Sequence, residues 1–560
     1  MKKNFVKSRW LFTMLLFVTT MIVPTMMLAE SITPKRPEGE GTAEKPFKIS
    51  NREELYWFAG LVNGTLPSGE KNASANAILM NDITVNEGVL DENKNLVSES
   101  DFIEWTPVGN NIYAYTGTFD GKGYTVSGLY FNNPNSSFVG LFGYIEANGK
   151  ISNVGVLDSY FQFRMYGAGV CGINNGELQN SSNSSTVIGN MEQGIGGVCG
   201  ENDNDGIIEN CFNEGTVSAT TEKGTFVFGG VGGVCGINEV GTIKSCYNTA
   251  SVSGKYAVGG VCGISSRGTT TNCYYLSNTA IGGIGGQDES GKAEKRSIEE
   301  FKSGEVAWLL NGKGLGEQVW GQQLGKDQYP VPGSDYKVIK AAQGDKDTNG
   351  NDTYWATFSN QTNDVTLSVP SERTLNVYNA TVSGGKLTLT QRNDKQVAKE
   401  EGVLLKTDGE YVNAKANKTN ELAKASSYEN HLVATPAEAK TVTAETGCKL
   451  YRLTYNKAEK KEDLGFYLGV DDGKSHKATP GKAYLKVSEN EAKAPSSAAL
   501  TRSFVFGGGS ETTGIDGITI MGTDVQRHGT VEGIFDLQGR KIVNPTKGIY
   551  IKNNKKVIIR

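Results

Sequence analysis

The residues that could perform acid–base or metal chemistry are few, and most of them are acidic. The densest group is Glu201, Asp203 and Asp205, with Glu209 following closely. Two carboxylates facing a shared groove would suit hydrolysis of a glycosidic bond, and such a group can also hold calcium. The neighbouring segments show no matching acids. We therefore interpret the group as a solvated turn and as a weak calcium candidate.

Bases that could complete such a site are also scarce. Arg164 and Arg267 are candidates for a lyase, but nothing in the sequence sets either of them opposite the acids. The chain has only His431, His476 and His528, no H-E-x-x-H, and no recognisable Ser-His-Asp or Cys-His arrangement. We predict no catalytic residue, no cofactor and no further metal site. A polysaccharide lyase or glycoside hydrolase stays open as the alternative.

The composition limits the partners. The chain has 560 residues with a net charge of −5 and 37% hydrophobic residues. This charge gives no electrostatic case for nucleic acid, and the apolar content is enough for packed cores. Glycine contributes 71 residues, which is roughly twice the usual share of about 7%.

The N-terminus indicates export. A basic head with Lys2, Lys3 and Lys7 precedes an apolar stretch over residues 10–23, and Ala29 is a small residue suited to cleavage. This pattern is typical of a secretory signal peptide. We predict cleavage after Ala29, a secreted or outer-membrane surface location, and no transmembrane segment in the mature chain. A membrane anchor is the alternative, but the stretch is shorter than the ~20 residues that a spanning helix needs.

A Gly-[Val/Leu]-x-Gly element recurs every 27 to 36 residues. Its five copies centre on Gly140, Gly169, Gly197, Gly233 and Gly260. Asparagine-containing elements such as Ile208-Glu-Asn210-Cys211 keep step with it. Each segment is short and rich in β-formers, so the repeat predicts a right-handed parallel β-solenoid with three short strands per turn. Valines would lie inside, asparagines at the bends, and cysteines above cysteines.

Seven of the eight cysteines fall on two predicted ladders. One ladder holds Cys171, Cys199, Cys235 and Cys262, and the other holds Cys211, Cys246 and Cys273. No CxxC pair and no nearby histidine supports zinc. We favour buried, reduced cysteines, because parallel strands in register orient both Cβ atoms alike. Disulfides between rungs stay open.

Helices are expected at both solenoid ends. A capping box of Ser50 and Glu53 would begin a helix running to Val62, and Ser297 with Glu300 would begin another. Beyond residue 336, alternating strands predict an antiparallel β-sandwich. The predicted divisions are 1–29 signal peptide, 30–130 N-terminal cap and first coils, 131–290 repeats, 291–335 C-terminal cap, 336–505 sandwich, 506–513 linker and 514–560 a small C-terminal β-domain. The fold class is all-β.

Two segments resemble known families. The Gly-Gly-Val-Cys-Gly core at 196–200 and its copies resemble the GLUG motif family of bacterial surface and secreted proteins. The ending Gly533-Ile-Phe-Asp-Leu-Gln-Gly-Arg-Lys541 resembles the C-terminal sorting domain of type IX secretion in Bacteroidetes. These resemblances imply a surface location and a secretion machinery as partner. Immunoglobulin A metallopeptidases can carry similar repeats, but their metal motif is absent here.

We therefore expect a non-enzymatic adhesin whose solenoid binds a host glycan or a host surface protein. A fimbrial or matrix subunit is a further alternative. Aromatic residues could contact sugars or pack within the strands. They are Tyr113, Tyr115, Tyr130, Tyr160, Phe161, Phe163, Tyr247, Tyr274 and Tyr275.

Overall fold

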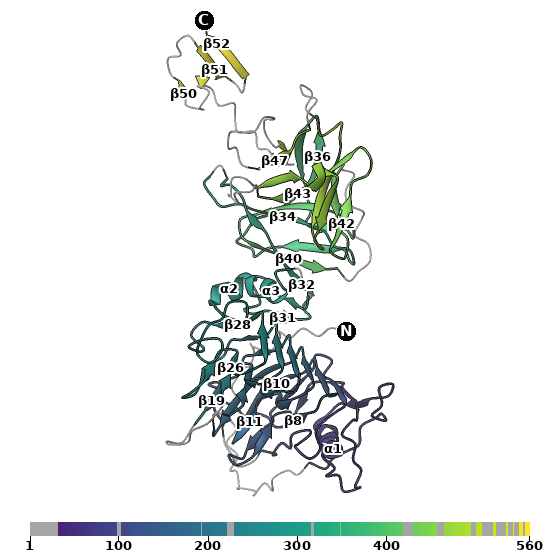
Figure 1. Cartoon of the computed structure of the whole chain (residues 1–560), viewed down its shortest axis with the longest axis vertical. Helices are drawn as coiled ribbons and strands as arrows, with labels where there is room; N and C mark the ends of the chain where they lie inside the picture. The colour runs from purple at the N-terminus through teal and green to yellow at the C-terminus, as the bar shows by residue number, and fades with distance from the viewer. Residues whose placement is uncertain are drawn as a thin grey trace, which may run out of the picture.

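The computed structural model describes residues 32–97, 102–191, 193–220, 229–314, 318–347, 349–417, 429–455, 464–493 and 500–506, plus short strands near the C-terminus. Its first half is a parallel β-solenoid of about seven turns. Antiparallel sheets follow it, and two short helices lie between the halves (Figure 1). The predicted signal peptide lies outside the described residues.

Four parallel sheets form the walls of the solenoid. Sheet 1 contains β1 (Phe47–Ile49), β2 (Ala77–Leu79), β4 (Thr118–Asp120), β9 (Lys150–Ser152), β13 (Glu177–Gln179), β17 (Ile207–Glu209), β22 (Thr242–Lys244) and β27 (Thr269–Thr271). Sheet 2 contains β3 (Ile83–Thr84), β5 (Thr125–Ser127), β6 (Tyr130–Asn132), β10 (Gly155–Phe163), β14 (Ser182–Gly189), β18 (Phe212–Asn213), β19 (Val217–Ala219), β23 (Tyr247–Asn248), β24 (Val252–Ser253), β28 (Cys273–Leu276) and β29 (Ala293–Arg296).

Sheets 3 and 4 are the remaining two walls. Sheet 3 contains β7 (Ser137–Val139), β11 (Met165–Gly167), β15 (Ile195–Gly196), β20 (Val231–Gly232) and β25 (Val258–Gly259). Sheet 4 contains β8 (Phe142–Ile145), β12 (Cys171–Asn174), β16 (Cys199–Asn202), β21 (Cys235–Asn238) and β26 (Cys262–Ser265). A turn thus has four walls, not the three predicted. The strands of sheet 3 are two or three residues long, too short to show alternation in the sequence.

Asparagine ladders hold successive coils together. Asn174 Nδ2 donates to Asn202 Oδ1 at 2.8 Å, and Asn202 Nδ2 donates to Asn238 Oδ1 at 3.0 Å, all within the buried interior. The corner between sheets 1 and 2 has a left-handed residue at the equivalent position of five successive coils, and four of the five are asparagine, among them Asn180 and Asn210 with φ of 49° and 55°. Asparagine tolerates this conformation better than most residues, so the repeat keeps it at the bend.

The repeat glycines are needed because their backbones approach the asparagine side chains closely. A Cβ on Gly169 or Gly197 would overlap the side chain of Asn183 or Asn213, respectively. Gly233 stands in the same relation to Asn248, while Gly260 meets the ring of Tyr275 and Gly140 meets neighbouring backbone.

A helix covers the N-terminal end of the solenoid. The helix α1 (Arg52–Asn63) buries Leu55, Trp57 and Phe58 in the solenoid core. Its N-cap is Asn51, and the Glu54 carboxylate accepts from the Ser50 N–H at 2.8 Å. The predicted capping box of Ser50 and Glu53 was therefore wrong by one residue, because Ile49 is still paired in β1.

The C-terminal end is closed by α2 (Ile298–Ser303) and α3 (Glu305–Leu310). The predicted capping box of Ser297 and Glu300 is confirmed. Phe301 packs with Tyr247 and Trp320 over the last coils. Asn413 of the following sheets donates to the Gln322 carbonyl at 2.7 Å and accepts from the Leu324 N–H at 2.8 Å. These buried bonds join the solenoid cap to the sheets.

The sheets after residue 336 form three layers. Sheet 5 contains β32 (Tyr336–Lys340), β35 (Val365–Ser368), β38 (Gln396–Val397) and β40 (Tyr411–Ala416). Sheet 6 contains β33 (Ala342–Gln343), β34 (Tyr354–Phe358), β36 (Leu375–Ser383), β37 (Lys386–Gln391), β39 (Val403–Thr407) and β48 (Thr519–Met521). Sheet 7 contains β41 (Leu432–Ala434), β43 (Cys448–Thr454), β44 (Gly465–Leu468), β46 (Ala483–Ser488) and β47 (Ser503–Val505). Sheet 6 lies in the middle, since Leu404 packs toward sheet 7 and Leu405 toward sheet 5.

Smaller elements complete the described chain. They are the pairs β30 (Trp320–Gly321) with β31 (Val331–Pro332) and β42 (Lys440–Thr443) with β45 (Ser475–Ala478), the turn α4 (Val470–Gly473), and a C-terminal sheet of β49 (Ile534–Phe535), β50 (Lys541–Ile542), β51 (Gly548–Lys552) and β52 (Lys555–Ile559). None of the described helices is long and apolar enough to cross a membrane.

Candidate functional site

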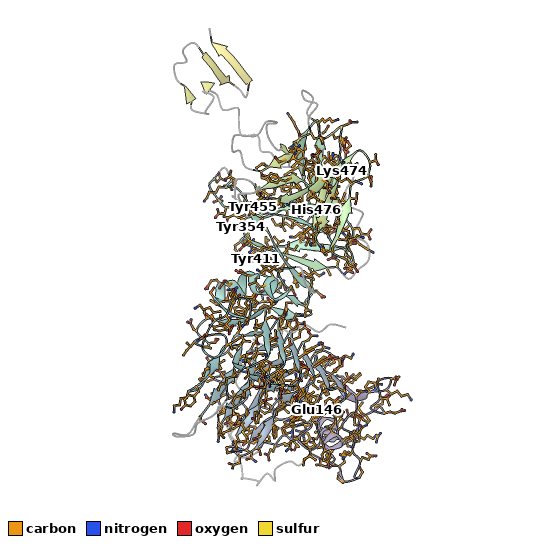
Figure 2. The ribbon with its side chains drawn as sticks, in the orientation of Figure 1. Glu146, Tyr354, Tyr411, Tyr455, Lys474 and His476 are labelled. Carbon is orange, nitrogen blue, oxygen red and sulfur yellow. The ribbon has the colours of Figure 1, made fainter. Side chains whose placement is uncertain are left out.

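Carboxylates from different coils gather where sheet 4 ends. Register places Glu201 in an outward row with Tyr144, Ile173 and Ile237. Two residues after each member of this row, the turn begins. The residues at this second position are Glu146, Asn175, Asp203 and Glu239. Glu146 lies on the solenoid among these coils (Figure 2). The sequence interpretation that neighbouring coils lack matching acids was therefore wrong.

Two aromatic residues with strained backbones lie in the neighbouring sheet 3. Phe138 and Tyr166 occupy equivalent positions in β7 and β11, and the next coil has Gly194 there. Their φ angles are 66° and 55°, in the left-handed region that bulky side chains avoid. Their rings stack at 5.8 Å with 5° between the planes, and Phe138 also contacts Tyr144 at 6.1 Å. Strain of this kind clusters at binding sites.

We name this region the corner strip. It consists of Phe138, Tyr144, Glu146, Tyr166, Asn175, Glu201, Asp203 and Glu239.

Hydrogen bonds within the corner strip leave one buried acceptor unfilled. Asn175 Nδ2 donates to Tyr144 Oη at 3.2 Å and to Glu146 Oε1 at 3.4 Å. Gln193 Nε2 donates to Tyr166 Oη at 2.6 Å. Asn175 is only 4% exposed, and its Oδ1 has no hydrogen-bond partner among the described residues. The oxygen has less than 1 Å² of exposed surface, so it is closed to solvent and an external ligand does not reach it.

The electrostatics of the strip follow from burial among like charges. Burial, with Asp203 and Glu239 adding repulsion, raises the pKa of Glu201 to about 7. Burial also raises the pKa of Tyr166, and the Glu201 charge adds to this effect. Arg267 Nη2 lies 3.3 Å from Glu239 Oε1. In the part of the chain that the structure describes, Glu201 and Asp203 form no ion pair.

The strip can therefore accept hydrogen bonds from a ligand and cover an apolar face of it. Asp203 is partly exposed and Asp205 is exposed, while Glu209 lies on sheet 1 and pairs with Lys244 at 2.7 Å. The predicted calcium candidate of Glu201, Asp203 and Asp205 forms no compact ligand group within the described residues. Of the candidate bases, Arg267 pairs with Glu239, and Arg164 is exposed at the start of β11.

Sugar contact and packing within the strands were both open for nine aromatic residues, and burial favours packing for most of them. Eight of them are buried: Tyr115, Tyr130, Tyr160, Phe161, Phe163, Tyr247, Tyr274 and Tyr275. Tyr113 is partly exposed and lies under Lys71, whose Nζ is 3.9 Å from its ring centre. The partly exposed rings of Phe138, Tyr144 and Tyr166 were missed. For Tyr166 the signal was an aromatic residue at a position that is glycine, Gly194, in the next coil.

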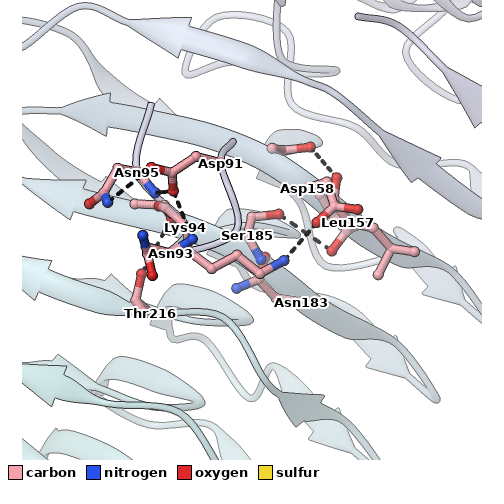
Figure 3. A network of polar contacts seen from close by, with 12 residues as sticks. Asp91, Asn93, Lys94, Asn95, Leu157, Asp158, Asn183, Ser185 and Thr216 are labelled. Atoms are coloured by element: carbon pink, nitrogen blue, oxygen red, sulfur yellow. Dashed lines mark hydrogen bonds and ion pairs between the residues drawn. The ribbon is translucent and has the colours of Figure 1, made fainter. Parts of the chain in front are cut away.

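A loop closes the face of sheet 2. The loop around Lys94 crosses β10 and β14, where Lys94 Nζ lies 2.6 Å from Asp158 Oδ1 and Thr186 Oγ1 donates to the Lys94 carbonyl at 2.6 Å (Figure 3). Asp91 Oδ1 accepts from the N–H groups of Asn93 and Asn95, each at 2.8 Å, which fixes the loop (Figure 3). The loop buries Tyr130 and Tyr160 against Val89.

The cysteines lie in register in the solenoid interior. Cys171, Cys199, Cys235 and Cys262 follow one another in sheet 4, and all seven solenoid cysteines, including Cys211, Cys246 and Cys273, are free and buried. Burial raises the pKa of the Cys199 and Cys246 thiols well above the usual value. Such thiols are poor nucleophiles and poor metal ligands.

One compact group of metal-type ligands exists elsewhere among the described residues, formed by Glu429, His431 and Glu491. His431 Nδ1 accepts from the Val382 N–H at 3.1 Å, and its Nε2 faces Glu429 Oε1 at 3.2 Å. A neutral imidazole that accepts at Nδ1 carries its proton at Nε2. Nε2 then has no lone pair for a metal, so the group is better explained as a histidine–glutamate contact.

A polar cavity of about 780 Å³ lies at one end of sheet 6. Arg373 and Lys406 contribute to its wall, together with Asp352 and Asp408. Arg373 is held by Asp408 at 3.4 Å, and Asp408 also accepts from the Thr374 N–H at 2.9 Å. Asp352 lies 3.8 Å from Lys346, and Lys406 Nζ lies 5.3 Å from the centre of the Trp355 ring.

Residues 192–218 match the family of the GLUG motif, and they contain β15 to β19 with Glu201 and Asp203. The chain is 27% identical over 162 residues to "Halomucin" of Haloquadratum walsbyi, a match that covers 29% of this chain and 2% of that protein. It is 34% identical over 56 residues to a "Putative Gly-rich membrane protein" of Evansella cellulosilytica, covering 10% of this chain and 6% of that one. The chain thus spans only a small fraction of these relatives.

A crystal structure from Bacteroides ovatus, described as a putative immunoglobulin A1 protease, aligns with a TM-score of 0.37 and 19% identity. The alignment covers 53% of this chain and 94% of that chain.

Proposed function

We propose that this chain is an exported, surface-displayed binding protein without enzymatic activity, and that it recognises a glycan through the corner strip. The observation that carries the proposal is the gathering of carboxylate oxygens from neighbouring coils beside the partly exposed rings of Phe138, Tyr144 and Tyr166. Sugar hydroxyls would donate to such oxygens, and their C–H faces would lie on Tyr166 and Phe138. The solenoid presents these groups on a rigid frame.

Export is part of the same proposal. The N-terminal 29 residues would direct secretion, and the C-terminal segment would be read by a type IX secretion machinery of a Bacteroidetes-type bacterium. The partial similarity to halomucin and to a Gly-rich membrane protein supports a cell-surface location. A host surface protein is the other partner that such an adhesin would bind.

A glycan array probed with the chain from residue 30 onwards tests the proposal. We expect binding that is lost in Asp203→Asn and in Tyr166→Gly. Glu209→Gln is the matched control, because Glu209 is in the same coil but lies on sheet 1 and pairs with Lys244. Array binding that is equal in all these proteins would contradict the assignment of the site.

One observation favours a second candidate, a glycoside hydrolase. Glu201 has its pKa raised to about 7 beside Asp203 and Glu239, and paired carboxylates with separated pKa values can act as acid and base. Release of reducing ends from array-positive glycans, abolished in Glu201→Gln with binding retained, would establish this activity. Binding without release supports the adhesin.

A further inference from the structure

The polar cavity of about 780 Å³ lies where β39 ends and where β34 and β36 begin. Register places Thr407, the last residue of β39, opposite Tyr354 and Leu375. Tyr354 lies in the half of the molecule that does not contain Glu146 (Figure 2). The volume is within the range of about 300–1,000 Å³ that small-molecule sites have. The cavity is therefore a candidate site of its own, separate from the corner strip.

The lining of the cavity is polar throughout. No aliphatic or aromatic side chain is among the described residues that form it. It carries three cations and three carboxylates, which are Lys346, Arg373, Lys406, Asp347, Asp352 and Asp408. A nucleobase would find no apolar surface here, and a ligand with several negative charges would meet three carboxylates. The lining favours a hydroxyl-rich ligand with a single charged group.

Two of the carboxylates already have their donors from the protein. Asp408 Oδ2 accepts from the N–H and from the hydroxyl of Thr374, each at 2.9 Å. Asp347 Oδ1 accepts from the Asn351 N–H at 2.8 Å, and its Oδ2 accepts from Asn351 Nδ2 at 3.1 Å. The hydrogen bonds from Asn351 lower the pKa of Asp347, so this carboxyl is ionised at neutral pH. These groups fix the walls and leave little capacity for further donors.

The cations are less fully used than the carboxylates. Lys346 lies 3.8 Å from Asp352. Arg373 directs Nε at Asp408, at 3.4 Å, and donates from Nη2 to Thr407 Oγ1 at 3.2 Å. Its Nη1 has no hydrogen-bond partner among the described residues. The guanidinium is thus held in place with one nitrogen left for a ligand.

Lys406 has the most unused donors. Its side chain is partly exposed, and Nζ lies 5.3 Å from the centre of the Trp355 ring. Within the described chain this ammonium forms no ion pair and no hydrogen bond. Its charge contributes, after the hydrogen bonds from Asn351, to the lowered pKa of Asp347, so the two charges lie near each other without pairing. The open positions of the cavity are therefore N–H donors on cations, which suit an anionic acceptor.

We propose that this cavity binds an acidic sugar, a hydroxyl-rich ring with one carboxylate or sulfate group. The acidic group accepts hydrogen bonds from Lys406 Nζ, and a further oxygen of the ligand accepts from Arg373 Nη1. The amide and hydroxyl side chains of the walls bond to the ring hydroxyls. This site is additional to the glycan site proposed on the corner strip and does not depend on it.

Three monosaccharides that differ at C6 test the proposal by isothermal titration calorimetry at pH 7 with the chain from residue 30 onwards. They are glucuronate, glucose 6-sulfate and glucose. We expect at least one of the two acids to bind about tenfold more tightly than glucose, because charge-assisted hydrogen bonds are the stronger ones. The acid with the higher affinity identifies the acidic group. Inorganic sulfate alone should bind more weakly than the preferred acid, since it lacks the ring.

Variants of Lys406 assign the preference to the cavity. Lys406→Gln should remove the preference for the acid, and Lys406→Arg, which keeps the charge, should retain it. Lys415→Gln is the matched control, because Lys415 Nζ also lies over an aromatic ring, 5.2 Å from the centre of Tyr336, but does not line the cavity. Circular dichroism of each variant verifies that the fold is retained.

Several results would overturn the inference. They are equal affinity for glucose and both acids, a preference that persists in Lys406→Gln, inorganic sulfate that binds as tightly as the preferred acid, and no binding of any of the three sugars. Asp203→Asn should leave the affinity for the acid unchanged, so failure of this site can be told apart from failure of the corner strip. Loss of acid binding in Asp203→Asn would assign the binding to the corner strip and overturn the inference as well.

Discussion

The left-handed backbone of Tyr166 leads to a prediction that reverses an ordinary preference. In a strand, glycine is less stable than alanine by about 0.5–1 kcal/mol, because it loses more conformational freedom on folding. At Tyr166, with φ of 55°, a residue with a Cβ has a strain of about 1–2 kcal/mol, which glycine does not have. Replacement of Tyr166 by glycine or by alanine removes the ring stack on Phe138 in both cases. This loss is therefore the same in the two variants and does not affect the difference between their stabilities. We expect Tyr166→Gly to be more stable than Tyr166→Ala by about 0.5–1 kcal/mol.

Thermal unfolding of the two variants gives the measurement. A difference of this size corresponds to about 1–3 °C in a chain of this length. Tyr144 is the control, since it lies on the same surface but its backbone is not in the left-handed region. Here the alanine variant should be more stable than the glycine variant. A melting temperature of Tyr166→Ala equal to or above that of Tyr166→Gly would refute the strained conformation of Tyr166. It would also remove the reason for regarding that ring as part of a site.

Three further outcomes follow. Asn202→Ala should lower the free energy of unfolding by about 2–4 kcal/mol, measured by urea titration, because it removes buried amide bonds to Asn174 and Asn238. Asn238 Oδ1 loses its donor, whereas Asn174 Nδ2 still donates to the Gly176 and Ile207 carbonyls. The raised pKa of Glu201 means that the folded chain holds the proton of this carboxyl more tightly than the unfolded chain does. The melting temperature should therefore fall as the pH rises from the usual glutamate range to about 7. Glu201→Gln should remove this fall. Iodoacetamide should label Cys448 alone in the native chain and all eight cysteines in denaturant, as mass spectrometry would show, because Cys448 is the partly exposed thiol; rapid native labelling at the ladder positions would contradict the buried, free thiols.

The solenoid could be predicted from the sequence because physical requirements fix the residue type at equivalent positions of successive coils. Gly169 and Gly197 must be glycine where asparagine side chains touch their Cα atoms, and the bend asparagines must adopt a left-handed conformation. Such requirements recur in several successive coils and so appear in the sequence at a nearly regular spacing. The capping box at Ser297 was equally readable because it is local.

The site was harder to predict because it is not local and does not repeat. Asp203 and Glu239 lie one above the other, yet their separation in the chain includes an insertion around residues 220–228 that disrupts the period. Only the register of Asn202 with Asn238 reveals that the residues after them are neighbours. The burial of aromatic residues such as Tyr247 depends on the end caps, and strand alternation does not report on those.

The exceptions within the ladders indicate how such a fold can acquire a site. The interior rows of asparagine, cysteine and valine hold the coils together, so an outward position can change without loss of the frame. Glu201 stands in a row whose neighbours are Ile173 and Ile237, and Tyr166 stands where the next coil has Gly194. Both departures impose a cost, from a buried charge in one case and a strained backbone in the other. Two such exceptions on adjacent rows of neighbouring coils are expected if a ligand compensates their cost. This is why binding should be sought on the corner strip more than at the buried tyrosines.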